Sequence, residues 1–277
     1  MPSSESTAPR ARAHHAEPQV VDIAGLPTAY RREGDGAPLV YLHGGGLTRV
    51  WLPFLEALAA HHDVLAPQHP GFGATPLPDG FDGFDDLVLH YDGLLDALEL
   101  DRIHLVGHSL GGWIAADLAV YYPRRFASLT LITPTGLRLL DAPLIDTFRM
   151  TPPQRRAALF NGRDAHHAQL FADEGATAEL IQDFTEQATL ARLTWNPRYD
   201  RKLDARLRRV RAPTLVIGAQ DDRVVPTAMA ARFAELIPGA RLLTAPGAPG
   251  EPSGHVPHVE DPDRMAAAVR EHIEAST

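Results

Sequence analysis

The chain of 277 residues is longer than one average domain, but an α/β domain with an inserted segment reaches this length, so two independent cores are not required. Hydrophobic residues at 44% and charged residues at 22% are typical of a folded globular protein and exclude a mainly disordered chain. The 35 acidic and 26 basic residues give a net charge of −9, which disfavours nucleic acid and anionic membranes as partners.

Cysteine is absent, which excludes disulfides, thiolate nucleophiles and zinc–thiolate sites. Residues 1–18 are rich in Ser, Pro, Ala, Arg and His without a continuous apolar stretch, so we expect a flexible leader there rather than a signal peptide. No uncharged apolar segment approaches the roughly 18 residues that cross a bilayer. We therefore expect a cytoplasmic protein that binds no membrane and no nucleic acid.

Short β-rich runs alternate with longer helical stretches from residue 38 onward, which predicts a parallel sheet with crossover helices. In chain order we expect a strand at 38–42, a helix at 50–60, a strand at 63–66, a helix at 87–100, strands at 102–106 and 127–133, and between them a helix at 111–122. Leu129, Leu131 and Ile132 show little polar alternation, as in strands that are buried on both faces.

The alternation stops at Pro134, and apolar residues at helical spacing predict a helical insertion over 134–209. After it, strands are expected at 213–217 and 240–244, with helices at 227–237 and 263–273. The expected organisation is a core formed by 19–133 and 210–277, interrupted by the insertion.

Ser109 lies at a sharp turn between a predicted strand and a predicted helix, within Gly107-His108-Ser109-Leu110-Gly111. Glycines two residues to either side remove side chains that would collide across such a turn. The helix start aims backbone N–H groups, first that of Leu110, at an oxyanion formed beside the serine. A lone G-x-S-x-G is a weak signal, but the strand before it and the helix after it favour a nucleophile.

The strand at 38–42 ends in a glycine loop, His43 followed by Gly44, Gly45 and Gly46. Without side chains, the amides of this loop can approach a substrate oxygen closely. We expect Gly45 to supply a second oxyanion donor, with Gly44 and Gly46 beside the substrate. The loop lacks the spacing and the Lys-Ser or Lys-Thr pair of a phosphate-binding P-loop.

A serine hydroxyl at neutral pH needs a histidine base, and usually a carboxylate that orients the histidine. The later strand ends offer Asp221 and Asp222, followed by His255 and His258. The chain order is therefore Ser, Asp, His.

With these motifs in this order, residues 19–277 resemble the α/β-hydrolase superfamily. The resemblance implies the α/β-hydrolase fold, a mostly parallel eight-stranded sheet flanked by helices, with a helical cap at 134–209 inserted after the sixth core strand. It implies Ser109 as nucleophile and His255 as base. The acid falls on Asp222, because relatives place it directly before an Arg-hydrophobic-hydrophobic-Pro run, and Asp221 is the second choice.

In the same resemblance, His108 and His258 are expected to pack rather than to react. The cap should shape the pocket for a mainly apolar small molecule, with Trp195 as one contact. No cofactor and no metal is expected, since the histidine pairs along the chain lack the i, i+4 spacing and the carboxylate of a zinc site.

The activity implied is hydrolysis of a carboxylic ester or lactone through an acyl-enzyme on Ser109. One alternative is cleavage of a carbon–carbon bond in a diketone-like substrate, as in meta-cleavage-product hydrolases, although these usually continue the glycine loop with Pro-Gly where this chain has Leu47-Thr48. Another alternative is a non-hydrolytic member of the fold that binds or cyclises a metabolite.

Overall fold

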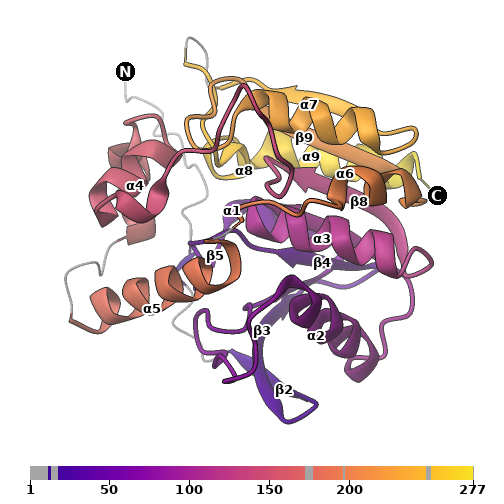
Figure 1. The fold of residues 1–277 in the computed structure, drawn as a ribbon. Coiled ribbons are helices and arrows are strands. Elements are labelled where there is room, and N and C mark those ends of the chain that lie inside the picture. Colours follow the sequence, from indigo (N-terminus) through magenta and orange to yellow (C-terminus); the bar gives the residue numbers. More distant parts are fainter. Residues whose placement is uncertain (1–11, 14–17, 172–176, 196, 248–250, 277) are drawn as a thin grey trace, which may run out of the picture.

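A sheet of eight strands organises the protein, in the order β10-β9-β8-β7-β4-β6-β3-β2 (Figure 1). The computed structural model describes residues 12–13, 18–171, 177–195, 197–247 and 251–276. The sheet strands are β2 (Gln19–Ile23), β3 (Leu26–Glu33), β4 (Pro38–Leu42), β6 (Asp63–Pro67), β7 (Ile103–His108), β8 (Phe126–Ile132), β9 (Thr214–Ala219) and β10 (Arg241–Ala245). The strands from β10 to β6 are parallel, and β3 and β2 pair antiparallel at one edge. The predicted eight-stranded, mostly parallel sheet is confirmed.

Helices cover both faces of this sheet. One face packs against α2 (Phe84–Ala97), α3 (Leu110–Tyr121) and α7 (Thr227–Leu236), and the other against α1 (Pro53–Ala59) and α9 (Pro262–Glu274). Shorter helices are α6 (Leu203–Arg206), η3 (Leu207–Arg209) and α8 (Pro257–Glu260). Between β8 and β9 the chain also forms η1 (Thr147–Arg149), α4 (Pro152–Leu159), η2 (Asp164–Phe171) and α5 (Thr177–Thr194), and α4 and α5 lie to the left of the sheet in Figure 1.

The strand order reverses at β4, which has β6 on one side and β7 on the other. Parallel α/β sheets bind ligands at such a reversal, in the crevice outside the carboxyl ends of the strands. The glycine loop follows β4 and Ser109 follows β7, so the topology brings these two motifs to the same crevice.

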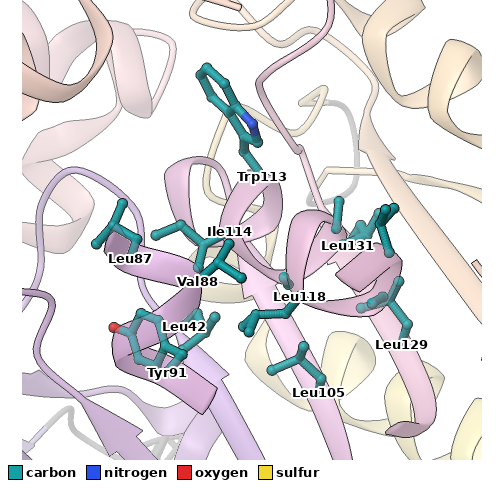
Figure 2. Packing of buried hydrophobic residues seen from close by; sticks show 14 of the residues in the cluster. Leu42, Leu87, Val88, Tyr91, Leu105, Trp113, Ile114, Leu118, Leu129 and Leu131 are labelled. Carbon is teal, nitrogen blue, oxygen red and sulfur yellow. The ribbon is translucent and has the colours of Figure 1, made fainter. Parts of the chain in front are cut away.

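Helix α3 packs on the central strands with α2 beside it (Figure 2), and from Leu110 to Val120 its residues are buried and, apart from Asp117, apolar. Ile114 and Leu118 of α3 are at most 2% exposed. A helix buried on every side has no polar stripe. Their neighbours in the cluster include Leu42, Leu87, Val88, Tyr91, Leu105, Trp113, Leu129 and Leu131.

The helix expected at 50–60 begins later than predicted. Val50–Trp51 form the short strand β5, which pairs antiparallel with β1 (Arg12–Ala13), and α1 starts only at Pro53. Proline fixes φ at the first helical position and holds the residue before it extended, as Leu52 is with ψ 148°. Apart from 12–13 and 18, the segment expected to be a flexible leader lies outside the described residues.

We predict that Gly111→Ala destabilises the protein. A Cβ on Gly111 would lie 2.1 Å from the Leu42 carbonyl oxygen and 2.5 Å from that of His43, and both are backbone atoms that cannot turn aside. We expect the free energy of unfolding to fall by about 3 kcal/mol or more, measured by urea denaturation. Gly80→Ala is the control, because a Cβ there meets nothing within 4 Å. Equal stability of the two variants would contradict this packing.

Candidate active site

Ser109 occupies the turn between β7 and α3 in a backbone conformation rarely adopted by residues with a side chain, at φ 53° and ψ −110°. Backbone bonds hold it on both sides: the Ser109 amide donates to the Ile132 carbonyl at 2.9 Å, and the Ser109 carbonyl accepts from Trp113 at 3.1 Å. The strained turn is thus fixed by the neighbouring strand and by the first turn of α3.

The structure brings Ser109, His255 and Asp222 together in one hydrogen-bonded chain. His255 Nε2 lies 2.9 Å from Ser109 Oγ, and His255 Nδ1 lies 2.8 Å from Asp222 Oδ2. The other carboxylate oxygen of Asp222 accepts the amides of Val224 and Val225, each at 2.8 Å. Because a carboxylate accepts at Nδ1, the proton belongs on that nitrogen and Nε2 is free to take the proton of the serine hydroxyl.

Two amides next to Ser109 are available to bind an oxygen. Gly45 and Leu110 line the same cavity as Ser109, and neither amide donates to an acceptor within the described part of the chain. Leu110 is the first residue of α3, where a helix leaves its N–H groups without internal acceptors. Both positions predicted for oxyanion donors can therefore perform that chemistry.

A buried hydrogen-bond network of Tyr91, His69 and His43 holds the start of the glycine loop. The Tyr91 hydroxyl donates to His69 Nδ1, and His69 Nε2–H donates to the His43 carbonyl at 2.8 Å. In return His43 Nε2 accepts the His69 amide at 3.1 Å, and His43 Nδ1–H donates to the Gly44 carbonyl at 2.6 Å. A single assignment of protons satisfies every bond, with both imidazoles neutral. Neither His69 nor Tyr91 was singled out in the sequence.

The rival base His258 and the rival acid Asp221 have other partners, and so does His108, which was expected to pack. His258 is 1% exposed and bonds Tyr41 Oη through Nε2 at 3.0 Å. His108 is buried and donates from Nε2 to the His255 carbonyl at 3.1 Å. Asp221 pairs with Arg223 at 3.1 Å, half exposed to solvent.

We predict that stability falls with acid in a range set by buried histidines. Burial lowers the pKa of His43 to about 4 and that of His258 to about 3, whereas in the unfolded chain each takes up a proton near pH 6.5. As the pH falls the unfolded state binds protons first, so this stability is complete above about pH 6.5 and is lost toward pH 4. Near pH 5 we expect a free energy of unfolding lower by about 2 kcal/mol per histidine than near pH 7.5, measured by urea titration. His258→Gln should weaken this pH dependence, and an unchanged slope would refute the assignment.

The C-terminal end of α4 holds the loops that carry Asp222 and His255. The Leu159 carbonyl accepts the amide of His255 at 2.9 Å. Asn161, with φ 54°, donates from Nδ2 to the Asp221 carbonyl at 2.7 Å. The segment between β8 and β9 therefore contacts the histidine and the loop of its carboxylate partner.

Arg163 completes this attachment through Glu260. Its Nη2 donates to the Pro252 carbonyl and to Glu260 Oε1, both at 2.8 Å. The other oxygen of Glu260 accepts the Gly254 amide at 2.6 Å, directly before His255. Burial raises the pKa of Glu260, so the nearby guanidinium is needed to keep this carboxylate charged.

Arg163→Met should therefore leave the buried carboxylate of Glu260 unpaired and lower the free energy of unfolding by about 3 kcal/mol. Arg232→Met is the control, since Arg232 forms exposed ion pairs with Asp204 and Glu235, which contribute little. Adding Glu260→Gln to Arg163→Met should restore part of the loss in a chemical denaturation series. Similar losses for Arg163→Met and Arg232→Met would show that the buried pair does not matter.

A cavity of about 720 Å³ opens next to Ser109 and His255. Apolar side chains from the segment between β8 and β9 line much of it: Leu144, Ile145, Phe148, Leu159, Leu170, Phe171, Leu180 and Leu190. Gly46 lines it as predicted, whereas Gly44 is not in the lining and lies against His108, whose Nδ1 would be 2.7 Å from a Cβ at that position.

Trp195 is a correction to the sequence prediction. It is 56% exposed, does not line the cavity, and packs its ring on Phe148, whose ring centroid is 5.3 Å away. Trp195 directly follows the last residue of α5, and helical spacing alone could not tell which side chains of that helix face inward. Phe148 and Phe171 are the aromatic residues of this segment that line the cavity.

Within the described residues, no group of three or more histidine, cysteine, aspartate or glutamate side chains is placed to hold a metal ion. No helix of that part of the chain has the length and apolar character to span a membrane.

Comparison with known proteins gives the family. A model of the alpha/beta hydrolase family matches residues 39–268. The chain is 30% identical over 240 residues to 2-hydroxy-6-oxo-2,4-heptadienoate hydrolase of Pseudomonas putida (81% of this chain, 86% of that protein), and 34% identical over 228 residues to the putative carbamate hydrolase RutD of Variovorax paradoxus (76% and 84%). The solved meta-cleavage product hydrolase CumD of Pseudomonas fluorescens is similar with a TM-score of 0.72 at 25% identity, over 94% of this chain and 99% of that one. The chain belongs to the α/β-hydrolase family and is an enzyme of that superfamily.

Proposed function

We propose that this enzyme hydrolyses a carboxylic ester or lactone of a mainly apolar small molecule, with Ser109 as nucleophile. The observation that carries the proposal is the continuous hydrogen-bonded chain from Ser109 through His255 to Asp222. It is supported by its position at the cavity and by the two available amides of Gly45 and Leu110.

In the first half of the reaction, Ser109 Oγ attacks the carbonyl carbon while its proton passes to His255 Nε2. Asp222 stabilises the imidazolium through Nδ1, and the amides of Gly45 and Leu110 bind the oxyanion. Collapse of this intermediate expels the alcohol, which takes the proton from His255, and leaves an acyl group on Ser109.

In the second half, a water molecule attacks the acyl carbon while His255 takes its proton. The same two amides stabilise the second oxyanion. Its collapse releases the carboxylic acid and returns the proton from His255 to Ser109. In a lactone, the alcohol and the acid remain parts of one product.

The segment 134–209 acts, in this proposal, as the cap that selects the substrate. Support comes from its apolar side chains in the cavity and from Leu190 of α5, whose Cδ2 would lie 3.0 Å from a Cβ on Gly45. A mostly apolar wall with a few polar groups is typical of small-molecule sites. In this proposal the substrate contacts α4 and α5 on one side and the glycine loop on the other, so both limit which shapes can bind.

Carbon–carbon bond hydrolysis is the second candidate, because the Pseudomonas putida relative and CumD are named for that type of substrate. The chain differs from the usual meta-cleavage-product pattern where Leu47 and Thr48 follow the glycine loop, and both residues line the cavity. Because of this difference we rank ester or lactone hydrolysis first. An intact nucleophile, base and acid argue against a non-hydrolytic binding protein.

A fluorophosphonate probe should label Ser109, because only an activated serine attacks such a phosphorus centre. Ser109→Ala should lose the label, keep the fold by circular dichroism, and hydrolyse p-nitrophenyl esters about 10⁴-fold more slowly or worse. Ser276→Ala, at the end of the chain, should keep both label and rate. Continued labelling or turnover by Ser109→Ala would place the nucleophile elsewhere.

The same wild-type preparation, given p-nitrophenyl esters of graded acyl length, lactones and a diketone, decides between the candidates. Turnover of esters or lactones above the diketone supports the first, and the reverse order supports carbon–carbon cleavage. Labelling without turnover of any of these would favour a binding role.

A further inference from the structure

Arg31 lines the cavity, although it belongs to none of the motifs that supply the nucleophile, the base, the acid or the glycine loop. It belongs to β3, opposite Ala66 near the carboxyl end of β6, and lines the same cavity as Ser109. The carboxyl ends of the parallel strands form the edge at which substrate binds. A cation on β3 can therefore face the substrate without belonging to any motif of the nucleophile, base or acid.

The next residue, Arg32, has an acidic partner, in contrast to Arg31. Successive strand residues point to opposite faces, and Arg32 bonds Asp63 with two parallel contacts, Nε to Oδ1 at 2.8 Å and Nη2 to Oδ2 at 2.6 Å. Within the part of the chain that the structure describes, Arg31 has no acidic partner, and its Nε is buried without a hydrogen-bond acceptor. A buried charged donor without an acceptor is destabilising, so its presence needs an explanation.

The acidic groups of the cavity are already satisfied. Asp183 pairs with Arg155 at 2.5 Å. Glu186 accepts the Gly73 amide at 2.9 Å, together with bonds from Gln182 at 3.0 Å and from Thr48 at 3.2 Å. Five arginines and two acidic residues line the cavity. Two of these arginines are already compensated, Arg155 by Asp183 and Arg198 by Asp146 at 3.0 Å.

A second arginine adds to the local positive potential. Arg49, which also lines the cavity, is close enough to Arg31 to oppose its charge: burial lowers the pKa of Arg31, and the Arg49 guanidinium lowers it further. Arg49 also acts on Glu186, whose pKa burial raises and Arg49 lowers. The like charge of Arg49 therefore disfavours an unpaired Arg31, and the inference of an anion rests on Arg31 alone.

We propose that Arg31 binds a carboxylate of the substrate, so that the enzyme acts on esters or lactones that also carry an acid group. The inference rests on the proposed function and narrows its substrate class. A guanidinium presents its donors in a planar fork that matches a carboxylate, and an anion there neutralises a charge that has no acidic partner within the described residues. The substrate then lies with its carboxylate at Arg31, its apolar body along α4 and α5, and its reacting carbonyl at Ser109.

Binding can be tested without turnover, in protein carrying Ser109→Ala. Isothermal titration calorimetry would compare monomethyl adipate, which keeps one carboxylate, with neutral dimethyl adipate. We expect the monoester to bind about 10-fold or more tightly than the diester, and Arg31→Gln to remove that preference. Arg32→Gln is the matched control, because its charge is on the same strand but paired with Asp63, and it should keep the preference. Equal affinity for the two esters, or loss of preference in both variants alike, would overturn the proposal.

Turnover provides the second measurement, in enzyme with Ser109 intact. The kcat/KM for the mono-p-nitrophenyl ester of glutaric acid should fall about 10- to 100-fold in Arg31→Gln, with p-nitrophenyl butyrate changed less than about two-fold. An equal fall for both esters would make Arg31 structural and overturn the inference. If neither ester is cleaved while the binding preference is intact, ester hydrolysis fails and the carboxylate site stands.

Discussion

Two backbones meet where α3 begins, and the geometry of the site depends on this contact. The Gly111 amide donates to the His43 carbonyl at 3.0 Å, and a side chain on residue 111 would lie 2.1 Å from the Leu42 carbonyl oxygen. The contact fixes the distance between the end of β4 and the turn after β7. The Gly45 amide and the Ser109 hydroxyl are therefore placed by main-chain packing, which cannot relax by a change of rotamer. Precision of this kind is what a preorganised oxyanion site requires.

The base and acid come to that turn on longer loops, and those loops are held by the segment that lines the cavity. Leu159 binds the His255 backbone, and Arg163 reaches Glu260 beside it. On the opposite wall, Leu190 lies against Gly45. In the proposed function, the part of the chain that selects the substrate is thus in direct contact with the groups that react. Changes in the segment between β8 and β9 should therefore alter rate and specificity together, because the same segment lines the cavity and binds the backbone of the base.

Local pattern was sufficient for the sheet and for the nucleophile turn, since a continuous apolar run identifies a buried strand, and glycines around a serine indicate a tight turn. It failed where the decisive contact is distant. Arg163 and Glu260 are separated by 97 residues, and nothing near either one indicates the pair. Phe184 is one of the apolar residues at helical spacing that predict the insertion over 134–209, yet its side chain is 74% exposed. Periodicity gives the existence of a helix, while its facing depends on tertiary packing.

The net charge of the chain, like periodicity, does not predict local features that depend on tertiary packing. A net charge of −9 describes the chain as a whole and led to the expectation that polyanions do not bind, but it says nothing about a cavity in which arginines outnumber acids. At the surface, water and salt screen each charge over a distance of about 8 Å at physiological ionic strength. In a half-buried cavity the same charge acts on its few neighbours with less screening. Buried histidines kept neutral, such as His43, contribute no charge to the site, so its potential is set by the arginines and their partners. A net negative charge and a locally cationic site are therefore compatible in one molecule. In the proposal for Arg31, the net charge disfavours large anions, while the local charge favours one small carboxylate inside the cavity.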